Sequence, residues 1–436
     1  MFTKVCIENF EGILNRIEFD FIAQSRKKEK QISLHKTHDG IYINKLVGIL
    51  AGNASGKTSI IDALGTLGSL MIEPIMTLDY NEERKKIRNL IKNMESDKDK
   101  INQMIENIKN SVVIEFQNVS RPDDDTYLEV EMYIEDNELT GYYNYILRLN
   151  GKERKIVEEK FSYRQNYKDE KIYILNLENT TECQLYYINR YHDNMLDLEM
   201  INKDALEYKY KYINVFFKHY IKNSDIIGID IFDFIEDMSF VKFYKKNPKI
   251  MESIIKIIDP KVKSIRMKSD NDEEELIYEM KTGGSITREN LSAGTKRFLN
   301  LVLNALEVIS KKGNLLIDEI ELNMHKELIF LILRLFIQLD NNSTQIIFTT
   351  NLPEIFDCIN EENQKIFKQD AIYLLNNING NIEVKKMSKI KIDDKRIKGD
   401  ALVSTIYKKE KIIVQPNKNR IDNFLKELNW LLWTSR

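Results

Sequence analysis

A run of small and hydroxyl residues ending in Gly-Lys-Thr has the composition of a phosphate-binding loop. It follows an apolar stretch at 46–50, and its candidate binding residues are Gly52, Asn53, Ala54, Ser55, Gly56, Lys57, Thr58 and Ser59. A loop between a buried strand and a helix directs its backbone N–H groups toward a phosphate. We expect Lys57 to bridge the β- and γ-phosphates of ATP, and Thr58 to hold Mg²⁺ through its hydroxyl. The consensus loop begins with glycine and this one with Ala51, which disfavours a positive φ, so we expect a slightly different turn into the loop.

Two adjacent carboxylates follow an apolar strand pattern at 315–317. ATP hydrolysis needs one carboxylate to hold the water shell of Mg²⁺ and a second one to polarise the attacking water. Because neighbouring side chains at a strand end diverge, Asp318 is the candidate Mg²⁺ ligand and Glu319 the candidate catalytic base. The alternative is an exposed acidic pair that only ends a strand, and the phosphate-binding pattern upstream argues against it.

A third motif, Leu-Ser-Ala-Gly-Thr-Lys-Arg at 291–297, opens an apolar helical pattern shortly before the acidic pair. Ser292 has the residue type of a helix N-cap. The amide of Gly294, beside the helix N-terminus, is a candidate second anion site.

These motifs, in this order, resemble the ABC-type ATPase heads of SMC and recombination-repair proteins, whose signature motif reads Leu-Ser-x-Gly. The pattern at 7–10 is similar to the opening strand of that family, and 291–297 is more similar still to short-armed AAA family ATPases of bacterial anti-phage systems. Those systems include abortive-infection, Septu-like, PARIS-like and overcoming-lysogenization-defect ATPases. The resemblance implies an α/β fold: a P-loop NTPase of the ABC-ATPase head type, with a mixed sheet flanked by helices, that uses ATP and Mg²⁺.

The resemblance also implies a homodimer or higher oligomer in which heads pack head to tail around ATP. Ser292 and Gly294 would then act in trans on the γ-phosphate bound by the other protomer. The segment 321–325 is similar to the family's D-loop, and His325 in it either lines the site or caps a helix.

One position departs from the family. Asn351 follows an apolar strand pattern at 345–350, where the family has a switch histidine that senses the γ-phosphate. Asparagine donates hydrogen bonds but carries no charge. We therefore expect Asn351 to act with Lys57 and Glu319 in the catalytic site, with ATP binding retained and slow hydrolysis, a property suited to a sensor.

The elements that must position these residues divide into three regions. We expect an N-terminal lobe of the head at 1–74, an inserted α+β lid and partner-docking region with a short helical hairpin at 75–262, and a C-terminal lobe at 263–436. The insert has a heptad-like stripe at 87–108, which is too short for long SMC-style arms and is also compatible with an ordinary amphipathic helix. Within the insert, strand patterns are expected at 111–116, 127–134 and 142–149, and a mainly helical pattern at 200–243.

Composition excludes several classes of protein. The 436 residues carry a net charge of −3, which excludes a uniformly basic nucleic-acid binder. Local lysine-rich segments at 391–399 and 408–411 could contact nucleic-acid phosphates or form a solvated face. Three dispersed cysteines allow no disulfide framework or zinc motif, and we expect neither a leader peptide nor a membrane-spanning segment. We expect a cytoplasmic protein without a membrane partner.

No nuclease pattern follows Asn351, so a separate effector, a nuclease or a toxin, is the expected partner. The leading hypothesis is a nucleotide-gated sensor and scaffold of an anti-phage complex. A DNA-repair ATPase that gates a nuclease is the first alternative, although repair heads carry longer coiled coils. The second is a nucleotide-binding interaction module with vestigial hydrolysis, suggested by Ala51 and Asn351.

Overall fold

The structure is a computed structural model of the chain. It describes residues 1–23, 32–52, 54–72, 121, 123–137, 139–150, 155–180, 203–222, 224–227, 236–270, 273–338, 343–360, 363–392, 395–396 and 403–404. Within these ranges, no helix is both long and apolar enough to cross a membrane.

A six-stranded sheet carries the predicted chemical motifs. Its strands, in spatial order, are β10 (Ser224–Ile227), β14 (Asn314–Ile317), β15 (Gln345–Thr350), β5 (Leu46–Ala51), β16 (Ile372–Ile378) and β17 (Asn381–Lys386). All neighbours are parallel except β16 and β17. The carboxyl ends of β5, β14 and β15 therefore meet at one edge, which is where parallel sheets bind ligands.

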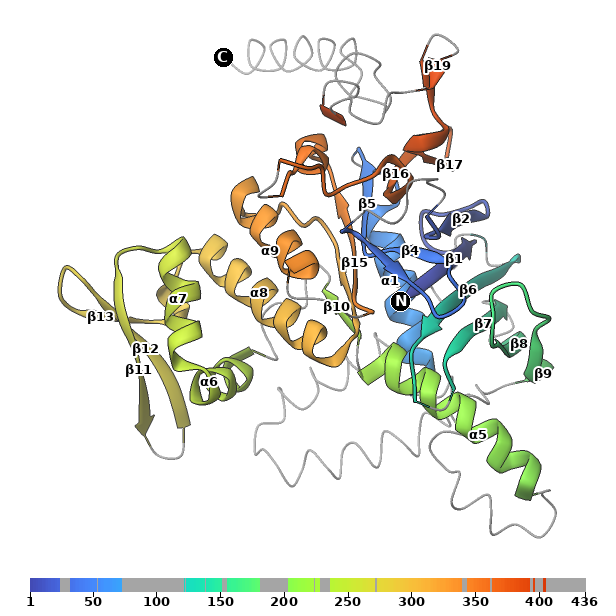
Figure 1. Cartoon of the computed structure of the whole chain (residues 1–436), viewed down its shortest axis with the longest axis horizontal. Helices are drawn as coiled ribbons and strands as arrows, with labels where there is room; N and C mark the ends of the chain where they lie inside the picture. Colours follow the sequence, from blue (N-terminus) through green and yellow to red (C-terminus); the bar gives the residue numbers. More distant parts are fainter. Residues whose placement is uncertain are drawn as a thin grey trace, which may run out of the picture.

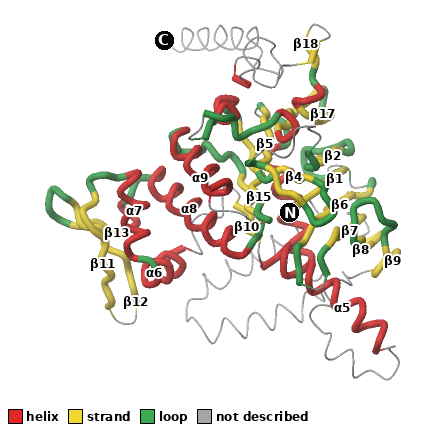
Figure 2. The backbone as a smooth tube through the Cα atoms, in the orientation of Figure 1, coloured by secondary structure: helices red, strands yellow, loops and turns green. Residues whose placement is uncertain are grey.

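Helices cover both faces of this sheet (Figures 1 and 2). Side chains of a strand alternate between its faces, and in β5 Val47 and Ile49 join one core while Leu46 and Leu50 join the other. The first core contains α1 (Lys57–Ile72) and the second contains α8 (Ala293–Lys311) and α9 (Lys326–Gln338).

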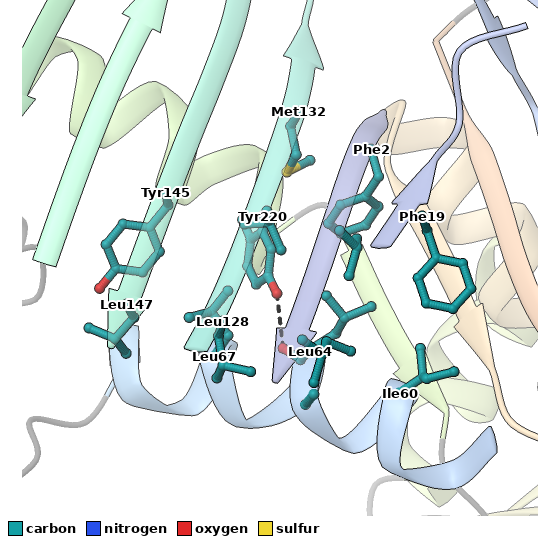
Figure 3. Close-up of a cluster of buried hydrophobic side chains, with 14 of the residues drawn as sticks. Phe2, Phe19, Ile60, Leu64, Leu67, Leu128, Met132, Tyr145, Leu147 and Tyr220 are labelled. Carbon is teal, nitrogen blue, oxygen red and sulfur yellow. Dashed lines mark hydrogen bonds between the residues drawn. The ribbon is translucent and has the colours of Figure 1, made fainter. Parts of the chain in front are cut away.

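A second sheet is antiparallel and closes over the far side of α1. Its order is β2 (Ile17–Asp20), β1 (Phe2–Glu8), β6 (Asp125–Ile134), β7 (Gly141–Asn150), β8 (Lys155–Arg164) and β9 (Ile172–Thr180). Figure 3 shows Leu64 and Leu67 of α1 against Leu128 and Leu147 of this sheet. Tyr220 lies in a π-helical turn (Lys218–Lys222), and its hydroxyl donates to the carbonyl oxygen of Leu64 at 2.9 Å. This bond connects the turn to the same core.

The remaining described elements lie outside these two sheets and the helices α1, α8 and α9. The helices are α5 (Lys203–Phe217), a π-helical turn (Lys218–Lys222), α6 (Glu236–Lys246), α7 (Pro248–Ile258) and short 3₁₀ turns at Arg288–Asn290, Pro353–Asp357, Gln369–Ala371 and Met387–Lys389. The strands are β3 (Leu34–Lys36) with β4 (Tyr42–Asn44), β11 (Val262–Asp270) with β12 (Glu273–Met280) and β13 (Ser285–Thr287), and β18 (Lys391–Ile392) with β19 (Lys395–Arg396). Figure 1 places β11–β13, α6 and α7 at the opposite end of the molecule from the antiparallel sheet, with α8 and α9 between them.

The expected α/β fold of a P-loop NTPase of the ABC-ATPase head type is confirmed. The patterns at 127–134 and 142–149 form the antiparallel pair β6 and β7. The stretch at 200–243 is not helical throughout, because β10 adds to the edge of the parallel sheet by pairing with β14. The stripe at 87–108, the strand pattern at 111–116 and the lysine-rich segment at 408–411 lie outside the described residues.

The expected division at residues 74 and 262 remains a prediction. Strands from the expected insert pair with strands outside it, since β6 lies beside β1 and β10 beside β14. These pairings make both sheets from distant parts of the chain.

Candidate nucleotide site

The loop between β5 and α1 has the backbone geometry of a phosphate-binding loop. Ala51 pairs in register with Leu375 as the last residue of β5, so alanine at this position needs no left-handed backbone. The left-handed residues are Ala54, with a φ of 56°, and Gly56, with a φ of 80°. A Cβ on Gly56 would lie 2.4 Å from Ile382 Cδ1, so glycine also allows a close approach there. Such consecutive turns expose N–H groups at the start of α1.

Lys57 is the first residue of α1, directly after this loop, and is only 6% exposed. Its Nζ donates to the carbonyl oxygen of Gly52 at 2.9 Å and to Asn351 Oδ1 at 2.8 Å. Burial holds the pKa of Lys57 below its ordinary value, although the carboxylates of Glu319, Glu321 and Asp318 oppose that shift. The predicted loop residues Ser55 and Ser59 are buried nearby, with Ser55 Oγ donating to the Gly52 carbonyl at 2.8 Å, whereas Asn53 lies outside the described residues.

Thr58 and Asp318 meet across the site, as expected for an Mg²⁺ pair. Thr58 Oγ1 donates to Asp318 Oδ2 at 2.7 Å, and Thr349 Oγ1 donates to the other carboxylate oxygen. Asp318 is fully buried. A hydroxyl and a carboxylate are hard oxygen ligands that suit Mg²⁺. The described residues contain no group of three or more His, Cys, Asp or Glu placed to hold a metal.

Glu319 directs its carboxylate toward the loop. Its Oε1 lies 3.9 Å from Lys57 Nζ and 3.5 Å from Asn351 Nδ2. The side chain is 26% exposed, so water can reach it. The backbone of Glu319 has a φ of 44°, an unusual conformation for a residue other than glycine. The carboxylate of Glu319 therefore lies beside both Lys57 and Asn351.

Asn351 connects these groups at the end of β15. Its amide oxygen accepts from Lys57, its amide nitrogen faces Glu319, and its backbone N–H donates to Glu321 Oε1 at 2.6 Å. The predicted trio of Lys57, Glu319 and Asn351 is therefore brought together.

Three residues of this site had no assigned role in the sequence analysis. Thr349 bonds to Asp318, Glu321 accepts from the Asn351 backbone, and Arg297 donates to the backbone of the acidic pair. The signals available in the sequence were a third carboxylate two residues after Glu319 and a threonine before Asn351. Neither signal reveals a contact between distant segments.

The signature motif lies at the start of α8. Ser292 is the N-cap, since its Oγ accepts the N–H of Thr295 at 3.1 Å, and the residue is exposed. A Cβ on Gly294 would lie 2.5 Å from the carbonyl oxygen of Asn323, so this glycine packs against the turn after the acidic pair of its own chain. His325 is exposed, and its carbonyl oxygen accepts the N–H of Leu328 at the start of α9.

The sheet order, the loop between β5 and α1, and the carboxylates after β14 define the fold of a P-loop NTPase of the ABC-ATPase head type. A family model described as "AAA domain, putative AbiEii toxin, Type IV TA system" matches residues 200–357. That match spans less than half of the chain; it includes the signature motif, the acidic pair and Asn351, and it leaves out the phosphate-binding loop. No curated protein matches the chain.

Solved structures of SMC heads are similar in fold. A SMC head bound to the C-terminal winged-helix domain of ScpA has 12% sequence identity and a TM-score of 0.45, over 88% of this chain and 96% of that one. A SMC head with an extended coiled coil, bound to the C-terminal domain of ScpA derived from Pyrococcus furiosus, has 12% identity and a TM-score of 0.40, over 88% and 95%. The SMC head domain from Thermotoga maritima has 11% identity and a TM-score of 0.39, over 90% and 99%.

Proposed function

We propose that this protein binds ATP with Mg²⁺ and hydrolyses it slowly, and that its nucleotide state controls a separate effector in an anti-phage defence complex. One observation carries the proposal. Lys57, Glu319 and Asn351 come from segments far apart in the sequence and converge at the carboxyl ends of adjacent parallel strands. This edge of the sheet is where a nucleotide binds in P-loop proteins.

Each residue has a role in this proposal. The loop N–H groups and Lys57 hold the β- and γ-phosphates, while Thr58 and Asp318 hold Mg²⁺. The ion, when bound, supplies positive charge that offsets the charge developing on the phosphates. Glu319 accepts a proton from the attacking water, which its exposure allows.

Slow hydrolysis follows from Asn351. It occupies a position beside both Lys57 and Glu319, yet its amide adds no positive charge where negative charge develops. The same residue favours the second candidate function, a nucleotide-binding interaction module in which hydrolysis is vestigial. A single-turnover measurement separates these two functions, because a vestigial site releases its ATP unchanged.

The defence role rests on two resemblances. The description of the matching family names a toxin of a type IV toxin–antitoxin system, and the motif at 291–297 resembles anti-phage ATPases. We propose that the protein is cytoplasmic and forms a homodimer or higher oligomer, in which heads pack head to tail around ATP. Within each chain, 75–262 is the proposed partner-docking insert between lobes at 1–74 and 263–436. A nuclease or toxin is the proposed effector, and nucleic acid a further candidate partner. The DNA-repair alternative is less favoured because the expected insert is too short for long arms.

The test compares Lys57→Ala and Glu319→Gln with Lys386→Ala, in which another buried lysine is lost that contacts Asp20 and Ile22 instead of the site residues. We expect Lys57→Ala to weaken ATP binding about 100-fold, since a charge-assisted contact to each phosphate is removed. Glu319→Gln should keep ATP affinity and lose about 10²- to 10⁴-fold in turnover, the usual contribution of a general base. Lys386→Ala should change neither quantity.

Calorimetry with ATP and a single-turnover assay measure both quantities. Unchanged ATP affinity in Lys57→Ala would contradict the nucleotide site. Phage challenge of cells that carry the gene with its genomic neighbours tests the defence role, and equal protection by the wild type and Lys57→Ala would contradict it.

A further inference from the structure

Arg297 is a buried cation on α8 that reaches the segment carrying the acidic pair. The residue is 5% exposed. Its Nη2 donates to the carbonyl oxygen of Asp318 at 3.0 Å and to that of Glu319 at 2.9 Å. Burial lowers the pKa of Arg297, while Glu321, Asp318 and Glu319 oppose that shift. A guanidinium keeps its charge in such surroundings, so these bonds are charge-assisted.

The backbone that Arg297 contacts is strained. Glu319 has a φ of 44°, and a left-handed conformation costs about 1–3 kcal/mol in a residue with a side chain. Such a conformation persists only where neighbouring groups hold it from several sides. Here Thr349 Oγ1 accepts the N–H of Glu319 at 2.8 Å, and the Thr349 carbonyl accepts the N–H of Ile320 at 3.1 Å. Arg297 holds the carbonyl side of the same residue.

A second contact joins α8 to this segment. Gly294 lies against the carbonyl oxygen of Asn323, at a distance that leaves no space for a Cβ. The first turn of α8 therefore packs on both ends of the turn that follows β14. A displacement of α8 would shift the backbone of Glu319, and its carboxylate with it.

We infer that Arg297 is a positioning residue for Glu319 in the hydrolysis proposed above, on which this inference rests. It keeps Glu319 in the left-handed conformation, so that the carboxylate faces Lys57 and Asn351. Arg297 does not itself touch the loop residues in any of these contacts, and it acts through the backbone. Removal of the Arg297 side chain should free the backbone of Glu319, and turnover should fall because the carboxylate is then misplaced.

The test compares Arg297→Met with Arg334→Met. Arg334, on α9, donates from Nη2 to the carbonyl oxygen of Ile359 at 2.8 Å, so the control loses the same kind of bond at a distant place. The first measurement is hydrogen exchange of the Glu319 and Ile320 amides without nucleotide. We expect both amides to exchange at least about tenfold faster in Arg297→Met, because the segment opens more easily without the two bonds. A tenfold change corresponds to a local opening free energy that is lower by about 1.4 kcal/mol. Exchange should be unchanged in Arg334→Met.

The second measurement is ATP turnover against ATP affinity. A misplacement of about 1 Å costs about 100-fold in rate, so kcat should fall by about that factor in Arg297→Met while the Kd for ATP stays within about threefold. In the Glu319→Gln background the same change should cause no further loss, because the positioned group is gone. Arg297→Lys keeps a donor and should recover part of the turnover, and it replaces the Met variant in both measurements if that variant does not fold.

Unchanged exchange at Glu319 and Ile320 would overturn the inference. So would a loss of kcat matched by an equal loss of ATP affinity, or an additional loss in the Glu319→Gln background. If the unaltered protein shows no turnover, the proposed hydrolysis fails instead, and the exchange measurement still decides whether Arg297 holds Glu319.

Discussion

Glu319 combines a left-handed backbone, with a φ of 44°, and a side chain placed beside Lys57. Glycine adopts this conformation freely, whereas a residue with a Cβ is strained by about 1–3 kcal/mol. A protein under selection for stability alone would place glycine or asparagine here. Glutamate at this position therefore costs stability, and strained residues of this kind cluster at functional sites.

The first prediction at this scale concerns that strain. Glu319→Gly should be more stable than Glu319→Ala by about 1 kcal/mol, since both lose the carboxylate and only alanine keeps the strain. The control is Glu307, an exposed position in the interior of α8, where glycine should be less stable than alanine by about 1 kcal/mol. Urea denaturation of the four variants measures these differences. The same sign at both positions would contradict the assigned backbone strain.

At the scale of elements, α8 and the turn after β14 form one packed unit. The signature glycine, expected from its resemblance to act on a phosphate of another protomer, lies against Asn323 of its own chain. Both roles are compatible, because a close approach of backbones also exposes the amides at the start of α8. The packing of Gly294 on Asn323 predicts that a larger residue at position 294 lowers stability even without ATP.

Gly294→Ala should therefore destabilise the protein by about 1–3 kcal/mol, the usual effect of adding a carbon to a filled space. Gly65, in the interior of α1, is a matched control because nothing lies within 4 Å of an added Cβ. Gly65→Ala should stabilise the protein by about 1 kcal/mol through helix propensity. Thermal and urea unfolding without nucleotide measure both changes. A neutral Gly294→Ala variant would show that α8 can move away from Asn323 freely.

At the scale of the whole molecule, the proposed assembly depends on which residues one chain presents to another. Ser292 caps α8 and is exposed, so it is available to another copy of the chain, whereas Lys57 is buried in its own loop. The proposed head-to-tail assembly pairs the loop of one protomer with the signature motif of the other. In this arrangement two different inactive variants can complement each other, which is not expected if both motifs act within one chain.

Ser292→Arg places a bulky cation on the proposed contact face, so it should lose turnover and still bind ATP normally. Mixing it with Lys57→Ala should restore part of the turnover, because one composite site in a mixed dimer then has an intact loop and an intact signature motif. A mixture of Ser292→Arg with the double variant Lys57→Ala, Ser292→Arg is the control and should restore none. Loss of ATP binding in Ser292→Arg alone, or no recovery in verified mixed dimers, counts against assembly in trans.

The sequence by itself determined the local parts of the site. The apolar runs before Gly52 and Asp318 predicted the strands β5 and β14, and Ser292 was correctly predicted as a helix cap. These features depend on residues within a few positions of one another, where periodicity and residue type are sufficient. The pairing of Thr58 with Asp318 was also predictable, since both residues follow strands of a sheet whose carboxyl ends coincide.

Only the tertiary structure decided which distant groups hold these parts in place. The bonds of Arg297 to the backbone of the acidic pair and the packing of Gly294 on Asn323 each join separate segments. The same is true of β10, whose short strand lay within a pattern that favoured helix and was recruited by the open edge of β14. Such contacts depend on the order of strands and the approach of helices, which long-range packing selects and local propensity does not encode.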